Sequence, residues 1–209
     1  MNPDALLAQG IDELGLALPD SALPRLLAFA ALLDKWNRTY NLTAIREPHR
    51  MTTHHLLDSL AVLPHLPEGR LADVGSGAGL PGVPIAAAQP ARAVTLNDAN
   101  AKKAAFLRQA RIELGLDNVD VHEGRVEQWH PHPGYDGVIS RGFAELAAFA
   151  AACRYLLAPQ GVLLAMKGTH PRAEVARLPA DIRVQQVTEL RVPFLDAERH
   201  LVRMSVCAA

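Results

Sequence analysis

Apolar residues recur at every third or fourth position in two stretches near the beginning of the chain. The first stretch follows Asp20-Ser21, which is suited to cap a helix, and continues to Trp36. The second begins after Pro48 and ends near Pro67. This spacing is typical of amphipathic helices that bury one face. We therefore expect residues 1–68 to form an N-terminal helical extension.

The pattern changes at residue 70, where short apolar runs begin to alternate with helical stretches. Such alternation predicts βαβ units and a parallel sheet. The expected strands are 70–74, 93–97, 119–122, 137–140 and 162–166. The expected helices are 81–89, 100–114 and 143–157, with Gly115 ending the second of them.

Two further apolar runs follow, at 183–192 and 200–208. Too few residues separate them for a helical crossover, so these strands should pair antiparallel. The expected fold class is therefore α/β and Rossmann-like, with a mostly parallel sheet, an antiparallel C-terminal strand and N-terminal helices. With 209 residues the chain suits a single domain, 1–209, whose core covers 69–209.

Charge limits the partners that the chain is expected to bind. The formal net charge is −1, and 21% of the residues are charged. Non-specific binding to nucleic acid normally requires a strongly cationic surface, and this charge balance argues against such binding. A local basic patch is compatible with it, since basic residues gather at 35–55, 102–111 and 199–203.

Neither metal chemistry nor membrane insertion is indicated. The two cysteines, Cys153 and Cys207, form no CxxC pair. His54-His55 and His130-x-His132 lack acids or cysteines at ligand spacing, so no metal is expected. No segment approaches the ~20 apolar residues of a membrane span, and the chain does not begin with a signal-peptide pattern. We expect a cytoplasmic protein without membrane contact.

Glycines are concentrated in Asp73-Val74-Gly75-Ser76-Gly77-Ala78-Gly79-Leu80-Pro81-Gly82, here called the glycine loop, between the first strand and the next helix. Glycine permits positive φ angles and lets a ligand lie against the backbone. From Gly77 the loop also satisfies GxGxxG, the dinucleotide fingerprint, although that match alone is weak. Asp73 would repel a pyrophosphate and attract a cation, directly or through water. With the antiparallel C-terminal pair, it favours a class I S-adenosylmethionine-dependent methyltransferase over a nicotinamide enzyme.

Two more candidate contacts follow the second and third strands. Asp98 lies roughly 20 residues past the glycine loop, where an acid can accept both ribose hydroxyls. Its alternative role is a helix N-cap ahead of Lys102 and Lys103. The segment Arg125-Val126-Glu127 lies where an adenine ring is expected, and its alternative is a plain surface turn.

Longer stretches resemble the small-subunit ribosomal RNA methyltransferase G family, also called glucose-inhibited division protein B. They span nearly the whole chain and are together far more specific than the glycine loop. The matching stretches are Lys35-Trp36-Asn37, Tyr40-Asn41-Leu42-Thr43, His55-Leu56-Leu57-Asp58-Ser59, Asp73 through Gly82, Lys102-Lys103, Phe106-Leu107, Arg125-Val126-Glu127, Asp136-Gly137-Val138-Ile139-Ser140-Arg141, Met166-Lys167-Gly168 and Glu198-Arg199-His200-Leu201-Val202. The chain departs from the family at Asn97, where an apolar residue is usual, and at Gly142, where alanine is usual.

The resemblance implies methyl transfer from S-adenosyl-L-methionine to N7 of one guanosine in the decoding-region loop of 16S ribosomal RNA. The expected context is the 30S subunit or an assembly intermediate, and the expected state is a monomer. Matching positions place cofactor contacts at Gly75, Leu80, Val126, Glu127 and Arg141. Together with the residues inferred above, the expected cofactor site comprises Asp73, Gly75, Gly77, Gly79, Leu80, Asp98, Val126, Glu127 and Arg141.

This chemistry requires positioning rather than proton removal, because guanine N7 presents an in-plane lone pair. The sequence Ser140-Arg141-Gly142-Phe143 differs from the Asp/Asn-Pro-Pro-aromatic turn common in amino-group methyltransferases. Both cysteines lie in apolar elements, which argues against covalent catalysis. Cationic side chains would hold phosphates or donate to guanine O6. We expect catalytic roles for Arg125, Lys167 and Arg199, and RNA contacts from Arg141, Lys167, Arg199 and His200, with surface ion pairs or helix caps as the alternative.

Two other functions remain open. The first is methylation of a small molecule or a protein, which would call for a closed apolar cavity around Arg141, Lys167 and Arg199 instead of an open basic face. The second is an RNA-binding or assembly protein that binds the cofactor without turnover. The intact glycine loop argues against this second possibility.

Overall fold

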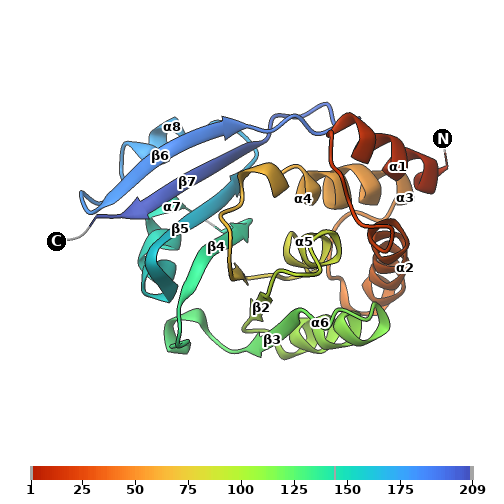
Figure 1. Ribbon diagram of the computed structural model, residues 1–209, viewed down its shortest axis with the longest axis horizontal. Coiled ribbons are helices and arrows are strands. Elements are labelled where there is room, and N and C mark those ends of the chain that lie inside the picture. Colours follow the sequence, from red (N-terminus) through yellow and green to blue (C-terminus); the bar gives the residue numbers. More distant parts are fainter. Residues whose placement is uncertain (1, 144, 208–209) are drawn as a thin grey trace.

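A seven-stranded sheet forms the centre of the protein (Figure 1). The computed structural model describes residues 2–143 and 145–207. The strand order is β3-β2-β1-β4-β5-β7-β6, in which β7 runs antiparallel to both neighbours and the remaining pairs are parallel. This arrangement confirms the predicted fold class.

Every strand predicted from the sequence is present. The bounds are β1 (Leu71–Val74), β2 (Val94–Asp98), β3 (Val119–Glu123), β4 (Tyr135–Arg141), β5 (Leu157–Lys167), β6 (Ile182–Glu189) and β7 (His200–Val206). Residue 208, with which the last predicted strand ended, lies outside the described residues.

Helices precede the sheet and connect its strands. The N-terminal elements are α1 (Pro3–Glu13), α2 (Ala22–Tyr40), α3 (Pro48–Met51), the π-helix η1 (Thr52–Leu57), α4 (Asp58–Leu60) and the turn η2 (Leu63–His65). The connecting elements are α5 (Gly82–Ala88), α6 (Ala101–Glu113), η3 (Val126–Gln128), α7 (Leu146–Cys153), η4 (Arg154–Leu156) and α8 (Arg172–Val175). Gly115 ends the α6 segment with φ +59°, as predicted.

Apolar clusters cover both faces of the sheet. Alternate residues of β1 separate the faces, since Leu71 packs with the N-terminal helices, α5 and α6, whereas Ala72 packs with α7. The predicted amphipathic α2 is confirmed, and its buried Phe29 has its ring centroid 6.4 Å from that of Phe106 on α6. Burying such a side chain contributes about 1.5–3 kcal/mol. The N-terminal helices are thereby fixed against the sheet layer.

The helix expected over 143–157 is shorter than predicted, and the strand after it is longer. The α-helix ends at Cys153, and β5 already begins at Leu157, which pairs with Tyr135 of β4. Between them Arg154–Leu156 form the single 3-10 turn η4, and the pairing of Leu157 with β4 ends the helical run. Residue 144, in the predicted range, lies outside the described residues.

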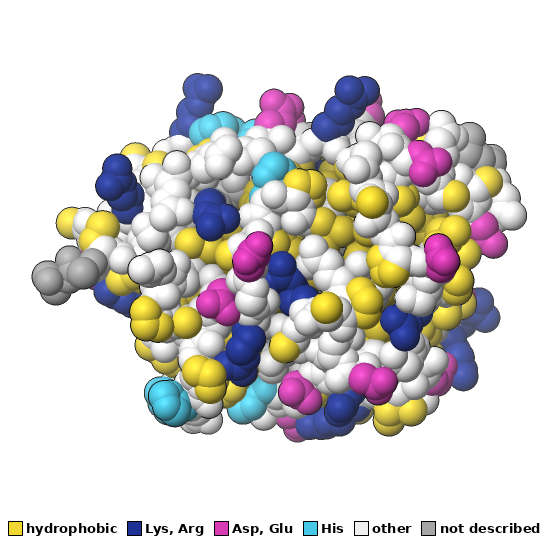
Figure 2. Space-filling view, in the orientation of Figure 1, with side chains coloured by type: hydrophobic (Ala, Val, Ile, Leu, Met, Phe, Trp, Pro, Cys, Tyr) yellow, Lys and Arg dark blue, Asp and Glu magenta, His cyan; other side chains and the backbone are white. Residues whose placement is uncertain are grey.

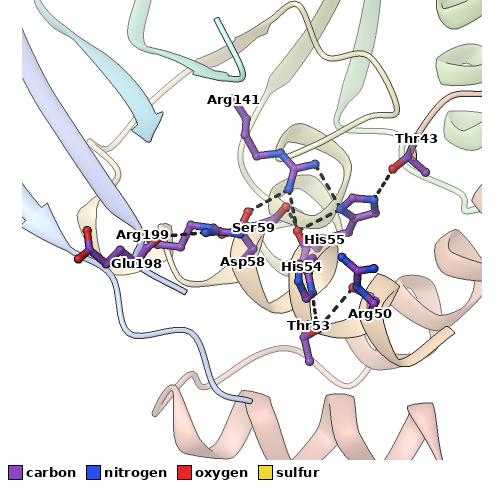
Figure 3. A network of polar contacts seen from close by, with 10 residues as sticks. All are labelled: Thr43, Arg50, Thr53, His54, His55, Asp58, Ser59, Arg141, Glu198 and Arg199. Atoms are coloured by element: carbon purple, nitrogen blue, oxygen red, sulfur yellow. Dashed lines mark hydrogen bonds and ion pairs between the residues drawn. The ribbon is translucent and has the colours of Figure 1, made fainter. Parts of the chain in front are cut away.

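The helix predicted after Pro48 is irregular. It passes from α3 into the π-helix η1 before the short α4. A π-helical stretch accommodates an extra residue in a turn and is frequent at functional sites. Here it carries His54 and His55 and ends immediately before Asp58, whose side chain points toward the end of β4 (Figure 3).

Candidate cofactor and substrate site

The carboxyl ends of the parallel strands meet at one sheet edge, where open α/β sheets bind ligands. The glycine loop leaves this edge after Val74, and Asp98, Arg141 and Lys167 are the last residues of β2, β4 and β5. The Ser140 hydroxyl donates to the Val74 carbonyl at 2.7 Å, which ties the end of β4 to that of β1. The predicted position of these residues at strand ends is thus confirmed.

The glycine loop has the backbone that its composition predicts. Gly75, Gly77 and Gly79 have φ values of +69°, +58° and +81°. A Cβ on Gly75 would meet no protein atom within 4 Å, so this backbone borders open space. A Cβ on Gly82 would instead collide with the Leu96 side chain. Gly82 therefore serves close packing of α5 on the sheet, whereas Gly75 leaves room for a ligand.

Asp73 is completely buried beneath the glycine loop. Its Oδ2 accepts a hydrogen bond from the Gly82 amide at 2.9 Å, and within the described residues its Oδ1 has no hydrogen-bond partner. Burial raises the pKa of the Asp73 carboxyl to about 6, although the Gly82 hydrogen bond and the Arg141 charge act in the opposite direction. Asp73 thus orders the start of α5 and leaves one anionic oxygen unsatisfied.

Asp98 links β2 to the glycine loop. Its Oδ2 accepts from the Gly77 amide at 2.9 Å, and its Oδ1 accepts from the Asn100 amide at 2.8 Å. The N-cap of α6 is Asn100, which accepts from the Lys102 and Lys103 amides, so the N-cap alternative for Asp98 is wrong. Each carboxylate oxygen retains acceptor capacity toward a further donor.

The expected adenine-side segment forms the single turn η3. Val126 is buried, and its carbonyl accepts a hydrogen bond from the Tyr155 hydroxyl. Arg125 and Glu127 are exposed on either side of it. Val126 therefore does not lie in a plain surface turn, because it packs into the apolar cluster on the α7 side of the sheet.

A pocket of about 430 Å³, here called the cationic pocket, lies at the same sheet edge. It brings together four of the residues predicted to contact RNA, but Arg125 does not line it. The lining consists of Ile45, His54, His55, Asp58, Arg141, Gly142, Phe143, Met166, Lys167, Gly168, Leu190, Arg199 and His200. Basic side chains from β4, β5 and the start of β7 thus converge with the N-terminal helices.

Asp58 stands at the centre of the polar network in this pocket (Figure 3). Its side chain is 2% exposed, and its two oxygens accept from Arg141 Nη1 and Arg199 Nε, both at 2.9 Å. Arg141 Nη1 also donates to the His54 carbonyl at 2.9 Å. One carboxylate therefore orients two guanidinium groups that are distant in the sequence, one at the end of β4 and one just before β7.

His55 supports the same network from η1. Its Nε2 lies 2.8 Å from Thr43 Oγ1, and its Nδ1 lies 3.4 Å from Arg141 Nη2. Desolvation, followed by the charge of Arg141, lowers the pKa of His55 to about 4. The Thr43 amide donates to Asn37 Oδ1 at 2.9 Å, which connects the network to α2. A neutral His55 thus adds no further positive charge beside Arg141.

Lys167 and His200 occupy neighbouring positions on β5 and β7. Lys167 Nζ lies 2.8 Å from Glu174 Oε2, an oxygen that also accepts from the Leu146 amide. His200 is 6% exposed, and among the described residues its Nδ1 has no hydrogen-bond partner. The cations of the pocket are therefore fixed by carboxylates, whereas His200 keeps a polar atom available.

Charges of both signs are interspersed over the face shown in Figure 2. On this face, lysine and arginine side chains therefore form only local groups, as expected for a net charge of −1. Within the part of the chain that the structure describes, no group of three or more His, Cys, Asp or Glu side chains is placed to hold a metal ion. In the same residues, no helix is long and apolar enough to cross a membrane.

Among the residues that hold the pocket together and that sequence reasoning missed are Asp58, His55 and Thr43. All three lie in stretches that carry the family resemblance, yet none stands at a predicted strand end. The signal that could have found Asp58 is an acid within an apolar helical face, since a buried carboxylate requires cationic partners.

The strand order and the glycine loop define the class of protein, a class I S-adenosylmethionine-dependent methyltransferase. An antiparallel β7 lies between β5 and β6, which differs from the all-parallel dinucleotide-binding sheet. Among solved structures, the fold is similar to that of a SAM-dependent methyltransferase from Aquifex aeolicus, with a TM-score of 0.59, 19% identity, and coverage of 85% of this chain and 98% of that one. It is also similar to ribosomal protein L11 methylase from Lactobacillus delbrueckii subsp. bulgaricus, with a TM-score of 0.55, 14% identity, and coverage of 77% and 80%.

The chain belongs to the family described as rRNA small subunit methyltransferase G, which matches residues 22–202. The ribosomal RNA small subunit methyltransferase G of Aromatoleum aromaticum is 57% identical over 204 residues, which cover 95% of this chain and 96% of that protein. The protein of the same name from Neisseria meningitidis serogroup A is 53% identical, with coverage of 95% and 96%. The resemblance seen in the sequence is confirmed.

Proposed function

We propose that this protein transfers a methyl group from S-adenosylmethionine to N7 of one guanosine in the decoding-region loop of 16S ribosomal RNA. The proposal rests on the cationic pocket, which lies at the same sheet edge as the glycine loop. It rests also on the match to the methyltransferase family over residues 22–202. The pocket supplies Arg141, Lys167 and Arg199 at the sheet edge where the glycine loop begins.

The residues at the glycine loop fit S-adenosylmethionine. The open space at Gly75 accommodates a ligand against the backbone, and the unsatisfied Oδ1 of Asp73 suits a cation rather than a pyrophosphate. Asp98 has acceptor capacity for ribose hydroxyls, while Val126 and Glu127 would border the adenine. The full set that would hold the cofactor comprises Asp73, Gly75, Gly77, Gly79, Leu80, Asp98, Val126, Glu127 and Arg141.

The reaction needs little proton chemistry from the protein. S-adenosylmethionine supplies an electrophilic methyl group on a sulfonium, and guanine N7 attacks it with an existing lone pair. Arg141, Lys167 and Arg199 would hold the RNA so that N7 faces that methyl group, which is catalysis by positioning. The carboxylates of Asp58 and Glu174 lower the positive electrostatic potential in the pocket. Methylation at N7 makes the base cationic, so a lower positive potential favours the product.

RNA is a better candidate substrate than a small molecule. A pocket lined by three fixed cations suits phosphates and a base edge, whereas an apolar metabolite would call for a closed apolar cavity. We further propose that the whole chain acts as one unit, as a cytoplasmic monomer, on the 30S subunit or an assembly intermediate. Arg125, exposed after β3, would contact RNA outside the cationic pocket.

The test is incubation of S-adenosylmethionine labelled in its methyl group with 30S subunits from a strain that lacks this gene. Label should enter 16S ribosomal RNA at a single guanosine of the decoding region, located by fragment mapping. Parallel incubation with protein-free 16S ribosomal RNA distinguishes the assembled subunit from the naked molecule as substrate. Label in ribosomal proteins, or in none of the fractions, would overturn the proposal.

A further inference from the structure

His200 occupies a position in the cationic pocket that the mechanism has not used. It is the first residue of β7, where it lies opposite Lys167 of β5 and Glu189 of β6. In the described residues, two buried side-chain polar atoms lack a hydrogen-bond partner, Asp73 Oδ1 and His200 Nδ1. A buried polar atom without a partner costs free energy, so such atoms are few in native proteins and are normally satisfied by ordered water or a ligand.

The other polar groups around His200 are engaged within the protein. Arg141 donates to Asp58 and to the His54 carbonyl, Arg199 donates to Asp58, and Lys167 is paired with Glu174. These paired arginine and lysine side chains are still cations, which suit phosphates. The imidazole of His200 differs because its Nδ1 is a small, directional donor or acceptor whose role no protein partner dictates.

We propose that His200 is a specificity-determining residue whose Nδ1–H donates a hydrogen bond to O6 of the target guanine. The inference rests on the proposed function. Guanine O6 lies beside N7 on the same base edge, so a base that turns N7 toward the cofactor also turns O6 toward this edge of the site. Adenine carries an amino donor where guanine has O6, and it would oppose the imidazole donor.

The test pairs a protein variant with an altered base. His200→Ala removes the donor, and 2-aminopurine at the target position removes O6 while keeping N7. In the wild-type protein the altered base should lower kcat/KM for RNA about tenfold, the usual effect of one lost hydrogen bond. In His200→Ala the same replacement should cost less than threefold, because the two groups act on each other.

His170 provides the matched control. It is exposed, and its ring packs edge-on against His200 with centroids 5.1 Å apart. His170→Ala should retain the tenfold discrimination of the wild-type protein. Equal losses with 2-aminopurine in wild type and His200→Ala would refute the O6 contact, even if His200→Ala is less active overall. Failure of the wild type to methylate guanosine would instead refute the proposed function.

Discussion

Gly75 combines a left-handed backbone with empty space in front of it. A residue with a Cβ adopts such a φ of +69° only at a cost of about 1–2 kcal/mol. Sterically, however, a Cβ there would touch nothing within 4 Å, so the protein itself does not require glycine at this place for packing. The space is therefore what a ligand would use.

Gly75→Val should abolish cofactor binding, because its side chain fills that space. Gly15→Val is a control matched for backbone strain, since Gly15 has φ +66° and also has nothing within 4 Å. Both variants should lose similar stability in thermal unfolding. Calorimetry with S-adenosylmethionine should detect binding only to Gly15→Val. Retained affinity in Gly75→Val would place the cofactor elsewhere.

The raised pKa of Asp73 predicts a pH dependence of cofactor affinity. Below its pKa of about 6 the carboxyl is protonated in the free protein, whereas a bound cation favours the carboxylate. Affinity for S-adenosylmethionine should therefore rise with pH through about 6. Between pH 3.8 and about 6 the Asp73 carboxyl binds more protons in the native state than in the unfolded state. Its contribution to the free energy of unfolding therefore falls as pH rises through this range. Asp73→Asn should flatten both profiles, measured by calorimetry and by urea unfolding.

At the scale of elements, α4 follows directly after the π-helix η1 and begins with Asp58, the acid that links β4 to the residue before β7. Asp58 orients Arg141 from β4 and Arg199 from the residue before β7. A buried carboxylate with two good partners is costly to break, because its removal leaves the partner charges uncompensated. The N-terminal helices thus complete the cationic pocket rather than only covering the sheet.

Asp58→Asn should lower the free energy of unfolding by about 3 kcal/mol, the scale for breaking a buried ion pair. Asp34→Asn is a suitable control, since Asp34 pairs with Arg38 on the surface of α2, where such a pair contributes at most ~0.5 kcal/mol. Urea unfolding at neutral pH measures both changes. A loss in Asp58→Asn as small as in the control would show that the two arginines do not depend on this carboxylate.

The elements of the sheet could be predicted because apolar runs, glycines and prolines mark them locally. The glycine loop and the strand-end residues Asp98, Arg141 and Lys167 followed from the same pattern. The early start of β5 at Leu157 was missed because the pairing of Leu157 with Tyr135 depends on a distant strand. The π-helix was missed because its apolar spacing resembles that of an α-helix.

The contacts of the pocket lay beyond prediction for a related reason. Asp58 and Arg199 are 141 positions apart in the chain, and nothing local to either residue indicates the other. The cap of α6 was likewise uncertain, since both Asp98 and Asn100 are capping residue types. Sequence reasoning located the residues at the sheet edge, whereas the structure showed which ones lie together.

At the scale of the whole molecule, the expected cofactor site and the cationic pocket share one sheet edge and Arg141, whereas Lys167, Arg199 and His200 belong to the pocket alone. Variants of the pocket should therefore separate binding of cofactor from methyl transfer. Lys167→Ala should leave the Kd for S-adenosylmethionine within twofold and lower kcat/KM for RNA by at least tenfold, since a charged hydrogen bond contributes about 1.5–3 kcal/mol. Arg183→Ala, at an exposed position of β6 outside the basic stretches, should change neither. Loss of cofactor binding in Lys167→Ala would contradict this separation.

Identification of the atom that receives the methyl group tests the proposed reaction. 16S ribosomal RNA from 30S subunits treated with the protein and S-adenosylmethionine bearing a trideuterated methyl group is digested to nucleosides and analysed by mass spectrometry. The label should appear in 7-methylguanosine. Its appearance in a guanosine methylated on N1 or N2, or in another nucleoside, would contradict a site that positions N7 and takes up no proton.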